Sequence, residues 1–132
     1  MALSNGTGGY QVGAGANDEP LLLVQGAPTA LTAAATATPA QLANGLFTFN
    51  GTAGNLTLPT VADFEKAYPS AARVNQAFDF FVVNIDGGTD DVTVAFGTGW
   101  TLVGAGQVDN GTSGHFRARK TGDGTWTCYR IS

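Results

Sequence analysis

Apolar and aromatic residues alternate with polar ones over most of the second half of this chain. Five short runs show the alternation, and each is rich in Val, Phe, Thr, Trp or Tyr, the residues that suit a pleated, half-buried surface. Clusters of Gly, Asn and Asp separate the runs, as is typical of turns between strands. The pattern predicts strands at residues 78–85, 91–96, 100–103, 115–120 and 125–131.

The same alternation predicts which side chains face the core. Along the predicted strands, the inward positions are Phe80, Val82, Trp126 and Cys128. Three polar side chains of these strands, Asp79, Asn84 and Arg130, are expected nearer to solvent or to a partner.

Two segments, residues 38–45 and 60–69, carry the start and stop signals of short helices. In the first, Thr38 stands at the N-cap and Pro39 at the first helical position, and an Asn-Gly pair ends the segment. In the second, Thr60 is the N-cap, with Asp three residues later, and a proline ends the helical pattern. One face of this second helix is expected to close an end of the body, through Phe64, Ala67 and Tyr68.

The first half of the chain holds weaker strand signals. Residues 46–49 and 56–58 flank an Asn- and Gly-rich stretch that reads as a hairpin-like connection. Residues 29–38 favour an irregular or edge strand, and residues 21–24 are a candidate first strand. About seven or eight short strands with two helical crossings predict an all-β fold, a jelly-roll-like β-sandwich with two short helices.

The N-terminal segment differs from the rest of the chain. Residues 1–19 contain five glycines, a single aromatic side chain at Tyr10 and no amphipathic period. Such a segment buries too little apolar surface to fold alone. We therefore expect a flexible, extended N-terminal arm at residues 1–26, which orders only against another chain, and a β-sandwich domain at residues 27–132.

Composition and charge exclude several classes of function. Only 12% of residues are charged, which leaves neutral Thr, Ala and Gly surface that is easily buried against another subunit. A net charge of −4 with six Lys and Arg argues against binding nucleic acid through phosphate neutralisation. No apolar run approaches the length of a membrane span, and no secretory signal is visible, so synthesis in a reducing cytoplasm is expected.

Side chains that could do chemistry are few. His115, the one histidine, has Ser113 two residues away, but this spacing does not give triad geometry, and a surface histidine is the favoured interpretation. The Asp-rich residues 86–91 lack the closing Glu of a calcium loop and favour a turn. The single cysteine, Cys128, favours a buried position, and the Gly-rich residues 6–15 are not followed by the Lys-Ser/Thr of a phosphate loop. We expect no enzyme activity, no metal and no cofactor.

A pair of arginines is the best candidate for contact with a partner. Arg117 and Arg119 alternate with apolar residues on one side of a strand, with Lys120 expected on the same side beyond a bend. Cations on an exposed strand face serve solubility or meet an acidic partner surface. Trp100, at a strand entrance, leaves open an exposed platform for stacking sugars.

Several stretches resemble small virion proteins of tailed phages, particularly marine and cyanobacterial ones. They include residues 8–19 (GGYQVGAGANDE), 99–104 (GWTLVG) and 113–117 (SGHFR). The chain resembles the β-rich domain of capsid decoration (cement) proteins and of related head fibres. The resemblance implies a homotrimer that stands on the outer surface of the phage head and bridges neighbouring subunits of the major capsid protein.

The expected function is therefore that of a structural virion protein that stabilises contacts between capsomers. The expected partners are the major capsid protein and further copies of this chain, with no nucleic acid and no membrane. The alternative is a head-fibre or tail-associated carbohydrate-binding module for host attachment, with Trp100 or Tyr129 as its exposed aromatic side chains. The side chains expected to dock on the capsid are Leu3, Tyr10, Gln11, Val12, Arg117 and Arg119.

Overall fold

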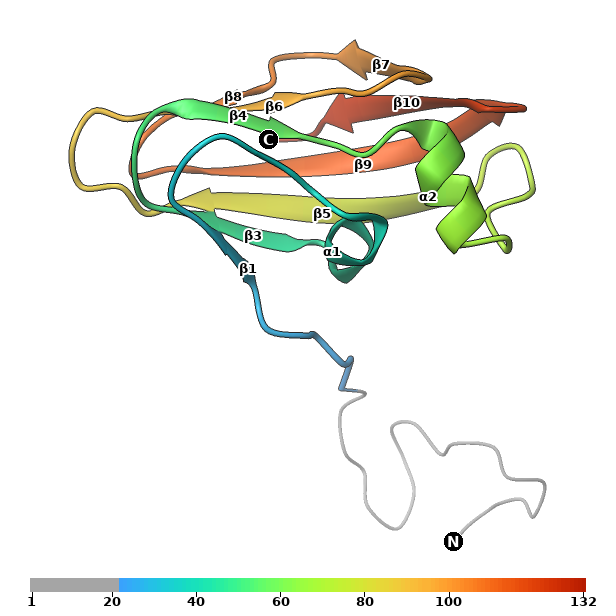
Figure 1. The fold of residues 1–132 in the computed structure, drawn as a ribbon, viewed down its shortest axis with the longest axis horizontal. Coiled ribbons are helices and arrows are strands. Elements are labelled where there is room, and N and C mark those ends of the chain that lie inside the picture. The colour runs from blue at the N-terminus through green and yellow to red at the C-terminus, as the bar shows by residue number, and fades with distance from the viewer. Residues whose placement is uncertain (1–21) are drawn as a thin grey trace, which may run out of the picture.

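Two β-sheets with one shared core make up the body of the protein (Figure 1). The computed structural model describes residues 22–132. These residues form ten strands and two helices: β1 (Thr29–Leu31), β2 (Ala35–Thr36), α1 (Pro39–Asn44), β3 (Leu46–Phe49), β4 (Gly54–Thr57), α2 (Val61–Ala67), β5 (Ala77–Asn84), β6 (Val92–Ala95), β7 (Trp100–Val103), β8 (Gln107–Val108), β9 (Ser113–Gly122) and β10 (Thr125–Arg130).

The first six strands alternate between the two sheets. β1, β3 and β5 lie side by side in a six-stranded sheet, and β2, β4 and β6 lie side by side in a four-stranded sheet. All four pairings among these strands are parallel. Residues 29–95 therefore wind through three successive turns, and each turn adds one strand to each sheet.

The remaining strands complete both sheets. β9 pairs antiparallel with β5, β10 pairs antiparallel with β9 and parallel with β7, and β8 pairs antiparallel with β6. The sheet orders are β1-β3-β5-β9-β10-β7 and β2-β4-β6-β8. The prediction of a mostly β body is confirmed. The mixed, largely parallel pairing was not expected from the sequence, because jelly rolls are built from antiparallel strands.

Both helices lie in connections that return the chain from the four-stranded to the six-stranded sheet, and they contact each other at one end of the body (Figure 1). Their predicted caps are confirmed. The Thr38 hydroxyl accepts from the backbone N–H of Gln41, and Gly45 ends α1 in the left-handed conformation at φ 77°. The Thr60 hydroxyl accepts from the N–H of Asp63. Of the three residues expected to face the body, Phe64 is buried, Tyr68 is half-buried and Ala67 is exposed.

The core contains side chains from both sheets and both helices. Phe80, Val82, Trp126 and Cys128 are all buried, as predicted. Phe80 stacks on Phe116 of β9 with ring centroids 5.1 Å apart. Burial also raises the pKa of the Cys128 thiol to about 12, so the thiol stays protonated.

Two polar side chains that the sequence placed near solvent are buried, which corrects the prediction. Asn84 is buried because its Nδ2 donates to the carbonyl oxygens of Asp90 and Val108, at 2.9 and 3.1 Å. Lys120 does not share a side with the arginines. β9 continues through it without a bend, so its side chain points inward, against the carboxylate of Glu65 on α2.

Two further predictions about the first half of the chain are wrong in part. Residues 50–53 do not close a hairpin, because β3 and β4 belong to different sheets. Leu22–Val24 are not in a strand, whereas the irregular edge strand predicted within residues 29–38 is present as β1 and β2, each at the edge of its sheet. The flexibility of residues 1–26 stays a prediction, since residues 1–21 lie outside the described part of the chain.

Candidate functional site

The outer face of the six-stranded sheet is the surface that holds both predicted arginines. Cross-strand register arranges its side chains in rows. The first, which we call the Phe81 row, runs across four neighbouring positions: Leu46 of β3 pairs with Phe81 of β5, and Phe81 pairs with His115 of β9. Ile131, just after β10, lies beside His115, because its N–H donates to the His115 carbonyl at 2.8 Å.

The Phe81 row is apolar and accessible. Phe81 is 41% exposed and Ile131 is 51% exposed, while Leu46 and His115 are half-buried. The imidazole of His115 stacks on the Phe81 ring, with centroids 4.5 Å apart. Large apolar side chains next to one another on a solvent-facing sheet are typical of a surface that a partner covers.

A second row lies next to the Phe81 row, two residues further along each strand. This Arg117 row is formed by Asp79, Arg117, Tyr129 and Val103. The guanidinium of Arg117 donates two hydrogen bonds to the Asp79 carboxylate, from Nε to Oδ1 at 2.6 Å and from one terminal nitrogen to Oδ2 at 2.9 Å. His115 also contacts Oδ2 of Asp79 through its Nε2, at 2.9 Å. The carboxylate therefore ties the two rows together.

The electrostatics of Asp79 follow from these contacts. The hydrogen bonds from Arg117, and to a lesser extent from His115, lower the pKa of the Asp79 carboxyl to about 2, although partial burial acts in the opposite direction. The same pair raises the pKa of Arg117. Asp79 is thus ionised at all physiological pH values, and its two hydrogen bonds hold the guanidinium of Arg117 beside it.

Arg119 lies in the next row of the same face, opposite Ala77 and Thr127. Its guanidinium donates to the Tyr129 hydroxyl at 3.1 and 2.7 Å and to Oδ1 of Asn75 at 2.9 Å. The sequence placed Arg117 and Arg119 on one face correctly, through their spacing of two residues. It did not find Asp79 or Phe81 as members of the same surface, because cross-strand register is not visible in a local pattern.

The remaining four predicted docking residues lie outside the described part of the chain. Leu3, Tyr10, Gln11 and Val12 precede residue 22, so their role as docking residues stays a prediction.

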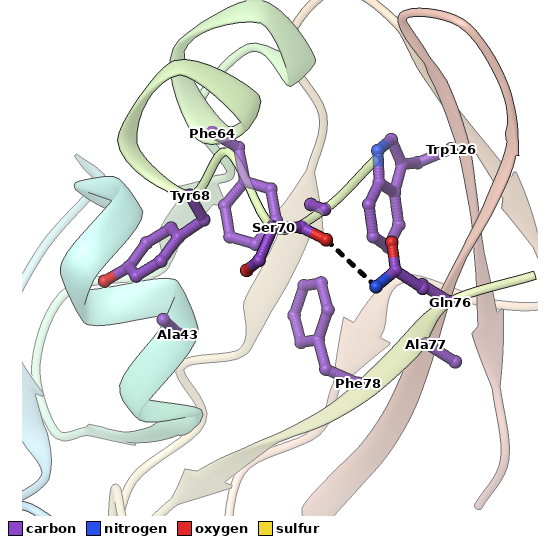
Figure 2. Close-up of a pocket in the computed structure, with 9 residues that line it drawn as sticks. Ala43, Phe64, Tyr68, Ser70, Gln76, Ala77, Phe78 and Trp126 are labelled. Atoms are coloured by element: carbon purple, nitrogen blue, oxygen red, sulfur yellow. Dashed lines mark hydrogen bonds between the residues drawn. The ribbon is translucent and has the colours of Figure 1, made fainter. Parts of the chain in front are cut away.

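A small pocket opens between the two helices and the start of β5 (Figure 2). Its volume is about 220 Å³, and four aromatic rings, from Phe64, Tyr68, Phe78 and Trp126, form most of its wall. The Gln76 amide at its rim is already bonded within the chain, donating to the Ser70 carbonyl and accepting from the Arg73 N–H. The pocket is therefore an apolar depression beside the core.

The other candidates named from the sequence have structural partners. Asp86 accepts from the N–H groups of Gly88 and Asp90, at 2.8 and 3.2 Å, which makes residues 86–91 a turn. Within residues 22–132, no three His, Cys, Asp or Glu side chains gather as a metal site. Trp100 is half-buried, and its indole N–H donates to the Pro59 carbonyl at 2.8 Å. An exposed sugar platform at Trp100 is therefore not formed.

No family model matches the chain, and neither a curated protein nor a solved structure is significantly similar to it. Neither helix in the described part of the chain is long and apolar enough to cross a membrane.

Proposed function

We propose that this protein is a non-enzymatic capsid decoration protein of a tailed phage, a homotrimer that binds the outside of the head. In this role it holds neighbouring capsomers together by adding contacts across their seams. The two facing sheets serve as a rigid block, jelly-roll-like in the loose sense that both sheets cover one core.

The observation that carries the proposal is the outer face of the six-stranded sheet. Exposed apolar side chains at Phe81 and Val103 lie beside arginines that are fixed in place by Asp79 and Tyr129. Interfaces favour this combination of aromatic side chains and arginine. A face of this kind suits burial against a protein surface.

The capsid contact is assigned mainly to the N-terminal residues Leu3, Tyr10, Gln11 and Val12, with Arg117 and Arg119 as a second contact. The arginines take the second place because their guanidinium groups already have partners within the chain. A cation that is paired in the unbound protein gains less from an acidic partner than an unpaired one does.

Three linked copies would make the binding strong even where each contact is weak. Once one arm of a trimer is bound, the other two are held close to equivalent sites, and the effective concentration of each rises to the millimolar range for short flexible links. The phage head supplies such repeated sites by symmetry.

Binding to purified capsids that lack this protein tests the proposal. Val12→Ala should reduce capsid occupancy, measured by sedimentation with capsids and gel quantification, and Tyr10→Ala should reduce it further because a larger side chain is lost. Val74→Ala is the matched control, since Val74 is 54% exposed and is not one of the predicted docking residues. Equal occupancy by full-length protein and a chain that begins at Leu21 would exclude the arm as the docking element. No binding by the full-length protein would refute the proposal itself.

The alternative, a carbohydrate-binding module of a head fibre or tail, has less support. Both aromatic side chains that it would use, Trp100 and Tyr129, are engaged within the chain. Titration of glycans while recording tryptophan fluorescence tests it, because Trp126 lines the one pocket described above. A saturable change would favour the alternative.

A further inference from the structure

We propose that residues 18–24 of one copy of this chain bind along the Phe81 row of a second copy. The inference deepens the proposed self-association and names the surfaces that make it. Its test needs no capsid, so that it and capsid binding can fail independently.

The binding segment is an apolar run that its own body leaves bare. Residues 21–24 read Leu-Leu-Leu-Val, and the side chains of Leu22, Leu23 and Val24 are 81%, 86% and 100% exposed. Three successive large apolar residues at such exposure are unusual for an isolated soluble chain. We therefore infer that another surface covers these side chains.

The segment projects from a fixed point. The Gln25 amide donates to the backbone and side-chain oxygens of Asn44 at the end of α1, at 2.9 and 3.1 Å, and the Asn44 amide donates to the Ala27 carbonyl at 2.9 Å. Ahead of this anchor, the chain that enters β1 runs away from the body (Figure 1). The apolar run is thus directed outward, toward a neighbour rather than back over its own sheet.

The dimensions of the two surfaces agree. Four extended residues span about 13 Å, and four side chains on neighbouring strands span about 14 Å, three inter-strand spacings. Residues 21–24 laid across the strands would therefore cover the Phe81 row from Leu46 to Ile131. The exposed rings and aliphatic groups of that row offer an apolar surface on which an apolar segment can be buried.

Charge complementarity fixes the orientation. Asp18 and Glu19 immediately precede the run, separated from it by one proline. On the sheet, Arg117 lies one row and Arg119 two rows from the Phe81 row, and Asp79 is the one carboxylate that pairs with Arg117. Rows lie about 7 Å apart, a distance that two extended residues bridge. The acidic pair would therefore meet the face at its basic rows.

Each copy carries one segment and one face, so the contact is of the head-to-tail type. Such contacts bury every segment and every Phe81 row when the copies close into a ring. Where the acidic pair occupies Arg117 and Arg119, these arginines serve the contact between copies, and the capsid contact is left to the residues ahead of Asp18. A ring of three copies matches the proposed trimer. The residues ahead of Asp18, including Tyr10 and Val12, take no part in the proposed contact.

Disulfide trapping tests the inference with the full-length chain. Leu23→Cys combined with Phe81→Cys should give interchain crosslinks under mild oxidation, seen as bands at two and three times the chain mass on a non-reducing gel. The native thiol does not interfere, because Cys128 is buried. Leu23→Cys combined with Val74→Cys is the matched control and should remain a single chain, since Val74 is exposed but does not belong to the Phe81 row.

Two outcomes would overturn the inference. One is a crosslink formed only within a single chain, which would show that the segment folds back on its own sheet. The other is no more crosslinking in the Leu23–Phe81 pair than in the control pair. Asp18→Asn with Glu19→Gln provides an independent reading, because loss of the charge contact should weaken association at low salt and much less at high salt. Association that is equal to wild type at low salt would refute the charge-guided orientation.

Discussion

Lys120 of β9 lies buried against Glu65 of α2, 55 residues away in the sequence. The ammonium group also sits 5.9 Å from the ring centroid of Trp126, and the Trp126 indole N–H donates to the same Glu65 oxygen at 3.0 Å. Burial by itself would raise the pKa of Glu65, but the hydrogen bonds from Lys120 and Trp126 hold it below its usual value. One carboxylate thus fixes α2 to two neighbouring strands.

Glu65→Gln should therefore destabilise the protein strongly. Without the carboxylate, the Lys120 ammonium stays buried without a counter-charge, which costs about 3 kcal/mol of unfolding free energy. Urea denaturation followed by tryptophan fluorescence measures the loss. The double variant Glu65→Gln, Lys120→Met should recover part of it, because no charge is then buried. A double variant less stable than Glu65→Gln alone would contradict this explanation.

Asp79 predicts a loss of stability at acid pH. Its pKa is about 2 in the folded protein against 3.8 in the unfolded chain, so above pH 4 the stabilisation is fully present. As the pH falls from about 4 toward 2, the unfolded chain takes up the proton first, and stability declines by an amount on the order of 1 kcal/mol for this partly exposed pair. Thermal unfolding at several pH values tests this. Asp79→Asn should reduce the slope, and an unchanged slope would show that other carboxyls control it.

Substitution by alanine should lower the free energy of unfolding much more at Phe80 than at its neighbour Phe81. Phe80 is fully buried, so Phe80→Ala should cost about 3–5 kcal/mol of unfolding free energy. Phe81 lies on the outer face, so Phe81→Ala should change the stability of the single chain by less than about 1 kcal/mol. Denaturant titration at low protein concentration compares the two. Similar losses would mean that the strand register is not the one described.

Gly51 lies where the turn after β3 contacts the turn after β1, and we predict that a methyl group at this position is not tolerated. A Cβ at this position would lie 2.0 Å from the Thr32 carbonyl oxygen, where the turn after β3 stacks on the turn after β1. Gly51→Ala should therefore cost more than about 1 kcal/mol through forced backbone displacement. Gly87→Ala is the control, because nothing lies within 4 Å of a Cβ there. Equal melting temperatures would argue against the stacked turns.

Self-association predicts a solution mass of about three times the 13.4 kDa chain. A chain with little charge hides neutral surface between copies, and closed cyclic symmetry is the usual arrangement. Multi-angle light scattering measures the mass at micromolar concentration. A monomer under these conditions would contradict both the proposed trimer and the proposed binding of residues 18–24 to the Phe81 row of a second copy.

Within this protein, the sequence alone determined the local elements. Strands β5, β6, β7, β9 and β10 follow from period-two alternation, because each has one face on the core, whereas the two-residue strand β8 was not predicted. The two helices follow from Thr38, Pro39 and Thr60, since caps are satisfied by atoms only three residues away. The same alternation correctly placed Arg117 and Arg119 on one face.

Only the tertiary structure decided which strands are neighbours and which polar side chains are buried. No local signal distinguishes β3 and β4 as members of different sheets, so a hairpin was expected where the chain crosses between sheets. Lys120 and Asn84 are buried because partners 55 and 24 residues away satisfy them. The Phe81 row likewise exists only through register between strands far apart in the chain, because side chains from different strands meet only after the sheet has formed.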